Sequence, residues 1–422
     1  MIEFSSVLMY IVAYFGLFTS IFFLLTLFEN RKNISNPLPK RLPSTTITVP
    51  AYNEEKTIAK TIKSLLKLDY PKDKLQIIVV DDGSTDKTYK VAKRFEQKNP
   101  NLRVFTKKNQ GKAAALNFAL KQSKTELFGA LDADSFVKKD ALKKIVGYFE
   151  DKKITAVTPS LKVYRPKTFL QKIQYIEYLM GIFLRKVFAF LGSIHVTPGP
   201  FTIYKKSFFK RYGGYDECNL TEDIEIALRM QSKGYEIENS VDASVYTVSP
   251  ARFKPLLNQR LRWYIGFIEN VIRYRQLFNP KKFGNLGLFI LPGSFISVLL
   301  VIITLIYAAY KFIFRTLIQN FLNLRSVGFN ITHLLNFEID LFYISLSSKI
   351  FISIILLLFG VSTIYIAKIL SKEKIKIKFL YIPYLILYWV LFGFWWIAAG
   401  IYTALGKRVE WGQKKHVKKT ST

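Results

Sequence analysis

Four long apolar stretches dominate the pattern of hydrophobic and polar positions in this chain of 422 residues. The first covers about residues 7–28, which is enough to cross ~30 Å of hydrocarbon as a helix. It is too long for the core of a signal peptide, and it lacks a basic leader and a small-residue cleavage site. The other three cover about residues 286–310, 341–370 and 379–405, and each is long enough to span a bilayer. We therefore expect a multi-pass membrane protein.

Between residues 45 and 246 the pattern changes to short apolar runs that alternate with segments of helical spacing. The expected elements are strands at 46–50, 75–80 and 125–131 and helices at 56–68 and 85–97. Strands that alternate with helices predict a parallel sheet with crossover helices. Such sheets bind ligands beyond the carboxyl ends of their strands. Polar clusters at those ends are therefore the first candidates for a site.

Two amphipathic stretches, residues 169–191 and 253–278, carry basic residues among apolar ones. Basic amphipathic helices can lie in the membrane interface, and we favour that interpretation because spans lie nearby in sequence. The alternative is a pair of ordinary core-packing helices.

The distribution of charge predicts which side of the membrane each segment occupies. Glu3 precedes the first stretch, and four basic residues follow it: Arg31, Lys32, Lys40 and Arg41. The positive-inside rule therefore places the N-terminus outside and the mixed domain in the cytoplasm of a cell-membrane protein. Three further single spans would leave the tail from Lys407 outside, yet that tail is strongly basic, which argues for the inside.

The conflict between the basic tail and three further spans leaves the number of spans open. Pro383 and Gly393 make the last apolar run the likeliest to break. Residues 315–340, a polar–apolar segment without a clear prediction, are the other candidate for an extra crossing.

Lys and Arg total 62 against 30 acidic residues, a net charge of +32. Such a charge would suit nucleic acid in a soluble protein. Here the apolar runs offer anionic lipid headgroups instead, and we expect no nucleic-acid partner. The single cysteine, Cys218, excludes an internal disulfide. The scarcity of His and Cys argues against zinc or iron–sulfur sites, so a metal would be a hard cation with oxygen ligands.

Polar clusters follow three of the expected strands: residues 50–54, 81–84 and 132–134. Asp132 and Asp134 are two positions apart, so on a strand their carboxylates face the same way. Two such carboxylates repel each other unless a cation lies between them, and that cation could neutralise a diphosphate leaving group. We expect Mn²⁺ or Mg²⁺ there, and the alternative is a solvated turn.

Other residues suit a nucleotide. Asp81 can accept a hydrogen bond from a nucleobase N–H, and Tyr52 offers a flat face for stacking. Lys112 lies where a helix is expected to open and can pair with phosphate. The plain alternatives are a turn residue for Asp81, a core tyrosine and an exposed lysine.

Two later motifs suit the transfer chemistry. Thr221-Glu222-Asp223 precedes a helix expected over 224–233, and Asp223 is either a general base or a helix cap. In Gln259-Arg260-Leu261-Arg262-Trp263, Trp263 can stack on a sugar and Arg262 can clamp phosphate. The alternative for that run is an interfacial helix with a Trp anchor.

Together these motifs resemble the membrane-bound glycosyltransferases of family 2, which include processive hyaluronan, chitin, cellulose and poly-N-acetylglucosamine synthases. The resemblance covers about residues 45–274, with five motifs in the family's order. It implies a GT-A fold: a cytoplasmic α/β domain with a Rossmann-like, mostly parallel sheet, joined to transmembrane and interfacial helices. The expected boundaries are 1–30 for the first span, 44–250 for the GT-A domain, 251–280 for the interfacial helix, 284–406 for the C-terminal membrane region and 407–422 for the tail.

The resemblance also implies a role for each matching position. Nucleotide-sugar binding falls to Pro50, Tyr52, Glu54, Asp81, Lys112 and Asp132. Metal binding falls to Asp134 with Asp132, and catalysis to Asp223 with Glu222. The diphosphate and acceptor fall to Gly199, Pro200, Gln259, Arg262 and Trp263. Trp411-Gly412 resembles the family's gating segment, with Lys414 or Lys415 where arginine is expected.

The implied reaction is the inverting, metal-dependent transfer of a sugar from a nucleotide sugar, with UDP as the expected nucleotide, to a growing β-linked glycan at the membrane. Transfer of one sugar to a lipid acceptor is the first alternative. A non-enzymatic membrane scaffold would have lost some of the acidic motifs, and a nucleic-acid binder would show steeply salt-dependent affinity. The motifs do not identify the sugar or the linkage.

Overall fold

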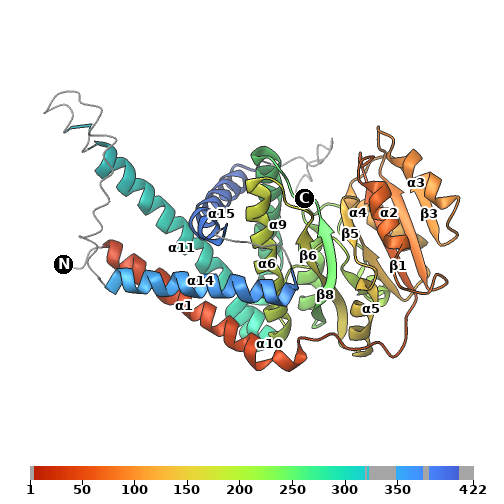
Figure 1. Ribbon diagram of the computed structural model, residues 1–422, viewed down its shortest axis with the longest axis horizontal. Coiled ribbons are helices and arrows are strands. Elements are labelled where there is room, and N and C mark those ends of the chain that lie inside the picture. Colours follow the sequence, from red (N-terminus) through yellow and green to blue (C-terminus); the bar gives the residue numbers. More distant parts are fainter. Residues whose placement is uncertain (1–3, 319–320, 323–347, 374–379, 408–422) are drawn as a thin grey trace, which may run out of the picture.

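The computed structural model describes residues 4–318, 321–322, 348–373 and 380–407. An α/β domain lies at one end, and long helices project away from it (Figure 1). The predicted gating segment at Trp411-Gly412 lies outside the described residues, as does most of segment 315–340.

One eight-stranded sheet forms the centre of the α/β domain, with strand order β3-β2-β1-β4-β7-β6-β8-β5. The strands are β1 (Thr45–Ala51), β2 (Leu75–Asp81), β3 (Leu102–Thr106), β4 (Leu127–Ala130), β5 (Ser135–Val137), β6 (Ile154–Val163), β7 (Ile203–Lys205) and β8 (Glu236–Thr247). Strands β1 to β4 are mutually parallel, and β6 is parallel to β8. The short strands β5 and β7 pair antiparallel with their neighbours.

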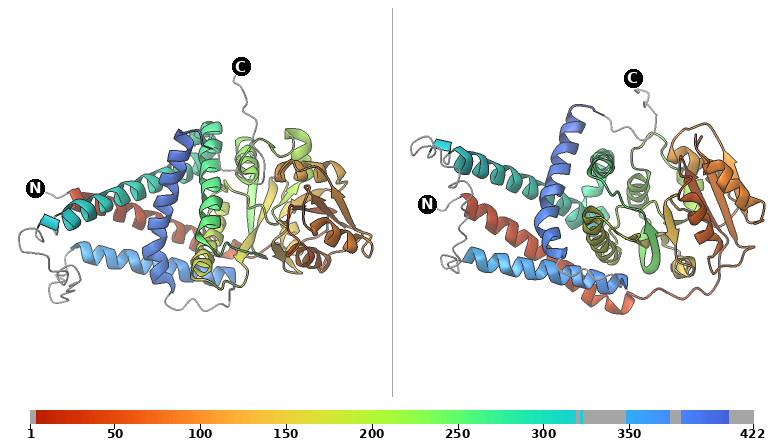
Figure 2. Two further views of the ribbon diagram at one scale, coloured as in Figure 1. Left: turned by 90° about the horizontal axis from the view of Figure 1, so that it is seen from above. Right: turned by 45° about the horizontal axis from the view of Figure 1, so that its top comes forward.

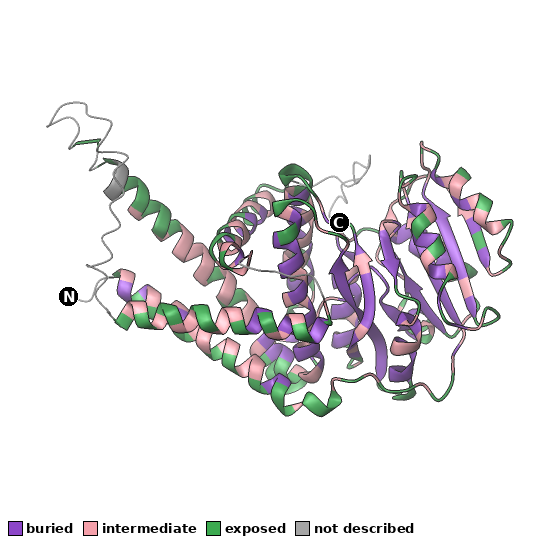
Figure 3. Ribbon diagram, viewed as in Figure 1, coloured by how far each residue is buried: buried purple, intermediate pink, exposed green. Residues whose placement is uncertain are grey.

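Six short helices accompany the sheet: α2 (Ile58–Leu66), α3 (Thr88–Glu96), α4 (Lys112–Gln122), α5 (Ala141–Val146), α7 (Lys206–Tyr212) and α8 (Glu222–Ser232). Both sheet faces are covered, as the buried strands in Figure 3 show. On β2, Ile77 and Val79 pack into one core cluster, whereas Ile78 and Val80 pack into another. This follows from the two-residue repeat of a strand, and burial on both faces explains the continuous apolar run of residues 77–80 in β2.

The strands and helices expected between residues 45 and 131 are present, with ends shifted by at most three residues. Strands β3, β5, β6, β7 and β8 were not predicted. The last helix of this domain, α8, begins at Glu222 rather than at residue 224.

Two long helices, α6 (Phe169–Phe190) and α9 (Phe253–Arg273), lie between the sheet and the projecting helices (Figure 1). Thr168 begins α6 with a capping box, because its side chain accepts from Gln171 N while Gln171 reaches back. Their position next to the projecting helices is the one expected of interfacial helices, which stays a prediction.

Four helices in the described residues are long and apolar enough to cross a membrane. They are α1 (Phe4–Glu29), Pro280–Phe314, α14 (Ser348–Ser371) and α15 (Tyr381–Ala404). The second contains α10 (Pro280–Asn285) and α11 (Leu291–Tyr310). Each exposes a large apolar surface, as lipid-facing helices do.

Helices α1, α11 and α14 run side by side away from the α/β domain (Figure 2). Their far ends meet, since the rings of Phe4 and Tyr307 are 5.2 Å apart and Tyr10 Oη lies 2.9 Å from Ser348 Oγ. Near the domain, Lys162 Nζ of β6 donates to the Ser371 carbonyl at the end of α14. Each of the three therefore has one end beside the domain and one end remote from it.

Helix α15 crosses the other three instead of running with them (Figure 2). Tyr384, near its start, packs with residues of α6, and Ala399, near its end, packs with Leu261 and Ile265 of α9. Both ends of this helix, ~36 Å long, therefore stay beside helices that adjoin the sheet.

The expectation that Pro383 and Gly393 break the last apolar run is wrong. Pro383 lies in the first turn of α15, where its missing N–H removes no helical hydrogen bond. Gly393 lies against α11, and a Cβ at this position would come within 3.0 Å of Val301 Cγ1. The glycine thus permits close helix packing.

This arrangement predicts that the chain after α15 returns to the side of the α/β domain. Single cysteines introduced in a Cys218→Ser background can report the side on intact cells with a membrane-impermeant maleimide. We expect Lys349→Cys, at the remote end of α14, to react from outside. Lys407→Cys should react only after permeabilisation, as should Lys98→Cys on the α/β domain. Labelling of Lys407→Cys on intact cells would mean that α15 crosses the bilayer.

Candidate active site

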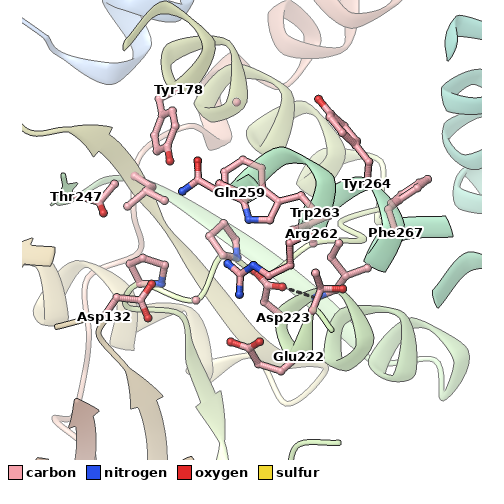
Figure 4. A pocket seen from close by; sticks show the side chains of 18 of the residues that line it. Asp132, Tyr178, Glu222, Asp223, Thr247, Gln259, Arg262, Trp263, Tyr264 and Phe267 are labelled. Atoms are coloured by element: carbon pink, nitrogen blue, oxygen red, sulfur yellow. Dashed lines mark hydrogen bonds between the residues drawn. The ribbon is translucent and has the colours of Figure 1, made fainter. Parts of the chain in front are cut away.

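A cavity of about 1060 Å³ opens at the carboxyl ends of β1 and β4 and extends between the long helices. Its polar end is formed by loops after the strands, by the start of α4 and by the start of α8. Figure 4 shows Glu222 and Asp223 on one side, with Gln259 and Trp263 of α9 above them. The parallel strands bring these distant segments together, as expected for this kind of sheet.

Thirteen of the fourteen predicted site residues line this one cavity: Pro50, Tyr52, Glu54, Lys112, Asp132, Asp134, Gly199, Pro200, Glu222, Asp223, Gln259, Arg262 and Trp263. Asp81 does not line it, and its neighbour Asp82 does. The Asp81 Oδ2 atom accepts from Thr106 Oγ1 at 2.9 Å, while its buried Oδ1 has no partner. Among the described residues no donor reaches this buried acceptor, and a base N–H is a donor of the type it lacks.

Asp82 has a structural role. Its carboxylate accepts from the backbone N–H groups of Gln110 and Gly111 and from Lys107 Nζ at 2.8 Å. These bonds fix the loop that leads into α4. Asn53 adopts a left-handed φ of 54° and accepts from Thr85 N, which ties the loop after β1 to the loop after β2.

Lys112 is held by two carboxylates. Its ammonium lies 2.7 Å from Asp132 Oδ1 and 2.9 Å from Glu222 Oε1. Burial lowers the pKa of Lys112, but the two carboxylates raise it overall, so the side chain is charged. Lys112 thus joins the strand-end cluster at residues 132–134 to the start of α8, which the sequence did not predict.

Gly199 makes room for that contact. A Cβ at residue 199 would come within 2.7 Å of Lys112 Nζ and 3.6 Å of Asp132. Phe201, two residues later, has a φ of 66°, which is uncommon for a bulky residue. The loop that contains Gly199 and Phe201 is therefore strained and packs directly against Lys112 and Asp132.

Asp134 lies in a strongly negative environment. Burial, with Asp132 and Glu54 nearby, raises the pKa of Asp134 to about 7. Burial and the same neighbour Asp132 also raise the pKa of Glu54. Carboxylates that repel one another this strongly favour a cation, and all of their donors are oxygens.

Within the described residues, no three His, Cys, Asp or Glu side chains come close enough to hold a metal ion. One or two carboxylates are nevertheless enough for an ion that takes its other ligands from substrate phosphates and water. The donor set around Asp132 and Asp134 therefore fits Mn²⁺ or Mg²⁺ bound together with a diphosphate.

Asp223 is the second residue of α8, and burial together with Glu222 raises its pKa to about 6. Glu222 differs, because Lys112 and Arg262 outweigh its burial and lower its pKa. Two adjacent carboxyls with opposite shifts are suited to different tasks. The Asp223 Oδ1 atom also accepts from the backbone N–H of Ile224 at 3.0 Å, so this side chain contributes to the start of α8 as well. Thr221 makes no side-chain cap bond.

Three side chains of the Gln259–Trp263 motif line the cavity, and one points toward α6. Gln259, Arg262 and Trp263 line the cavity, and the buried Gln259 Oε1 has no partner. Arg260 points the other way: it is fully buried, lies 2.6 Å from Glu177 Oε2 of α6 and stacks over the Trp263 ring at 4.2 Å. This ion pair joins the two long helices, α6 and α9, at the motif.

A second contact, between α9 and the start of α8, was also missed by sequence reasoning. A Cβ at Gly266 would come within 2.3 Å of Thr221 Oγ1, so only glycine fits. One turn later, the buried Asn270 Nδ2 donates to Thr221 Oγ1 and to Asn219 Oδ1, both at 3.0 Å. The signal was present in the sequence, because residues 259, 266 and 270 form one polar or small stripe on a helix.

The rest of the cavity is largely apolar. Its lining includes Phe23 of α1, Phe289 and Val298 near or on α11, and Phe392 and Trp396 of α15. Residues 177, 178, 181, 184, 185 and 188 line it along one face of α6. The cavity thus runs from a charged cluster beside the sheet to the helices expected in the membrane.

Residues 46–213 match the family described as "Glycosyl transferase family 2". The poly-beta-1,6-N-acetyl-D-glucosamine synthase of Staphylococcus aureus strain COL is 34% identical over 270 residues, which cover 63% of this chain and 64% of that protein. The match therefore spans less than two thirds of that relative. The protein of the same name from Staphylococcus epidermidis is 31% identical over 344 residues, 81% of this chain and 79% of that protein.

A solved structure with a similar fold is the mannosyltransferase from Pyrobaculum calidifontis in complex with GDP-Man and Mn²⁺. It aligns with 95% of this chain and 100% of its own, at a TM-score of 0.57 and 21% identity. The expected GT-A-like fold, with a mixed α/β domain, a largely parallel sheet and long apolar helices, is thereby confirmed.

The buried Arg260–Glu177 pair predicts a large effect on stability. Glu177→Gln leaves the guanidinium without its carboxylate, which should destabilise the protein by ~3 kcal/mol or more. Thermal unfolding of the detergent-solubilised protein measures this as a lower midpoint. Glu177→Leu combined with Arg260→Met should recover part of the loss. Asp69→Asn, which breaks an exposed pair with Lys143, is the control and should change little. An unchanged midpoint in Glu177→Gln would contradict the role of the pair.

Proposed function

This chain belongs to the family 2 glycosyltransferases, and we propose that it transfers a sugar from a UDP-linked donor to a growing β-linked glycan at the membrane. One observation carries the proposal. A single cavity gathers an acidic cluster, a buried candidate base and the Gln259–Trp263 motif, and it continues into the apolar helices. The α/β domain then acts on the cytoplasmic side of the cell membrane.

In this proposal the donor lies across the strand ends. Tyr52 stacks on the uracil ring, and the free Asp81 Oδ1 accepts from the base. Pro50, Glu54 and Asp132 border the nucleotide. Lys112 and Arg262 lie close enough to the carboxylates to balance their charge and to face the negative diphosphate. The relatives named as N-acetylglucosamine polymer synthases support a UDP-linked amino sugar.

Asp223 is the proposed general base. Its pKa of about 6 leaves it ionised at neutral pH yet basic enough to take a proton from an acceptor hydroxyl. The hydroxyl oxygen forms a bond to the anomeric carbon as the bond from that carbon to the diphosphate oxygen breaks. Attack from the opposite face inverts the configuration, so an α-linked donor gives a β-link. Glu222 positions Lys112 and stays ionised.

Asp134, with Asp132, would hold Mn²⁺ or Mg²⁺. When bound, the ion supplies charge neutralisation for the departing diphosphate. The chain's own part is to present the two carboxylates from one loop, with Ser135 Oγ donating to Asp134 Oδ1 at 3.0 Å to fix its orientation. Lys112 and Arg262 add fixed positive charge on the far side of the cluster.

The acceptor end lies at Gln259, Trp263, Gly199 and Pro200. Trp263 offers a stacking face, and the free Gln259 Oε1 accepts from a sugar hydroxyl. A second candidate function is transfer of one sugar to a lipid acceptor. The apolar lining from α1, α11 and α15 favours it, because hydrocarbon needs no polar partners. A long product bound to the membrane would identify the first function, and a single-sugar glycolipid the second.

The proposed base and metal ligand can be tested with a panel of radiolabelled nucleotide sugars in the presence of Mn²⁺ or Mg²⁺. We expect Asp223→Asn and Asp134→Asn each to lower kcat by about 10²- to 10⁴-fold, because one loses the proton acceptor and the other a metal ligand. Removing the metal with EDTA should abolish turnover, and adding it back should restore it. The exposed Asp73→Asn is the matched control. Full activity in both variants would rule the mechanism out.

The shifted pKa of Asp223 predicts a pH dependence. A base with a pKa near 6 loses its function as the pH falls below 6, so kcat should fall about tenfold per pH unit there and level off above 7. The measurement is kcat from pH 5 to 8 at saturating Mn²⁺, which suppresses the competing protonation of Asp134. A flat profile down to pH 5 would exclude Asp223 as the base, provided that chemistry limits the rate.

A further inference from the structure

Among the described residues, Arg185 is a cation in the cavity without an ion-pair partner. It lines the cavity from α6, its buried Nε has no hydrogen bond, and no carboxylate of the described residues pairs with it. Its guanidinium lies back over Gly181, one turn earlier, with Nη1 and Nη2 each 3.5 Å from the position that a Cβ there would take.

Other buried cations nearby do have partners. Lys186, the next residue of α6, lies 3.6 Å from Glu238, and Arg260 lies 2.6 Å from Glu177. Lys162 of β6 lies 3.1 Å from Glu373. A buried charge is costly when unpaired, so the different treatment of Arg185 points to an anion that comes from outside the chain.

The charge of Arg185 persists at neutral pH. Burial lowers its pKa to about 10, which still leaves the guanidinium protonated at pH 7. His195 lines the same cavity, but burial outweighs the contact of its Nδ1 with the Ser193 carbonyl at 3.3 Å and lowers its pKa, so it adds no second charge at neutral pH. A single fixed positive charge therefore faces this part of the cavity.

The surroundings of Arg185 are apolar. Phe188, one turn along α6, contacts Phe23 of α1, with ring centroids 5.7 Å apart. Phe23 in turn contacts Phe289, at the start of the helical stretch that continues as α11. The lining near the guanidinium thus comes from helices with lipid-facing apolar surfaces. An anion with a hydrocarbon chain matches both features, whereas a free polar anion matches only the charge.

We propose that Arg185 binds the phosphate group of a lipid whose hydrocarbon chain lies along the apolar part of the cavity. The planar guanidinium can donate two parallel hydrogen bonds to phosphate oxygens. The inference rests on the proposed function only in placing the acceptor in the same cavity. A lipid phosphate is compatible with both candidate functions, as the acceptor of a single sugar or as the carrier on which a glycan grows.

Equilibrium binding of radiolabelled farnesyl phosphate to the purified, detergent-solubilised full chain tests this proposal without any sugar donor. Arg185→Gln should weaken binding by at least about tenfold, because it removes one partner of a desolvated charge pair. Arg185→Lys should keep part of the affinity, since it retains the charge but not the two-pronged geometry. The matched control is Arg275→Gln, an exposed arginine that should bind as the parent does. UDP titration of the same samples checks that each variant is folded.

Two competitors identify the ligand. Farnesol should bind weakly and equally to the parent and to Arg185→Gln, and inorganic phosphate should displace the probe poorly. Equal affinity of Arg185→Gln and the parent for farnesyl phosphate would overturn the proposal. Displacement by inorganic phosphate as efficient as by farnesyl phosphate would overturn the lipid part. If binding depends on Arg185 but no nucleotide sugar supports transfer, the proposed function fails and this site stands.

Discussion

A buried arginine is costly unless an anion lies close to it, and Glu177 supplies that anion for Arg260 at the centre of this protein. Because Arg260 belongs to the Gln259–Trp263 motif, the pair joins α6 to α9 at the motif itself. Trp263 on one side and Trp395 of α15 on the other stack against the same guanidinium, at 4.2 and 5.5 Å. Three helices from different parts of the sequence therefore share one contact, and the face of α9 that borders the cavity is oriented by it.

The charged cluster at the other end of the cavity depends on the same helix. Lys112 bridges Asp132 and Glu222, and Glu222 opens α8, whose approach to α9 is fixed by Thr221, Gly266 and Asn270. Acidic and basic groups come from strand ends and from helices, and Lys112 lies within 2.9 Å of both of its carboxylates, so the cavity holds opposite charges close together. Such preorganised charge is what a departing diphosphate requires.

Local features were predictable from the sequence. The strands β1 and β2 and the apolar stretches depend on periodicity within a few residues, and the sequence motifs supplied thirteen members of the cavity lining. Features that depend on distant contacts were not predictable. The three-residue strands β5 and β7 exist only because longer neighbours pair with them. Likewise, the direction of α15 and the partner of Arg260 depend on packing that no local pattern records.

The close approach at Gly266 has a consequence for how substrates get in. With no space for even a methyl group between α9 and Thr221, and with Asn270 bonded across the gap, the helix bearing Asp223 and the helix bearing Trp263 form one rigid unit. A lid formed by lifting α9 off the base would have to break those bonds in a buried region. In the proposed function, donor and product would then exchange past the strand-end loops, while the apolar end of the cavity is lined by residues of α1, α11 and α15. A water-soluble donor and a membrane-bound acceptor would then approach one reaction centre from different ends of the cavity.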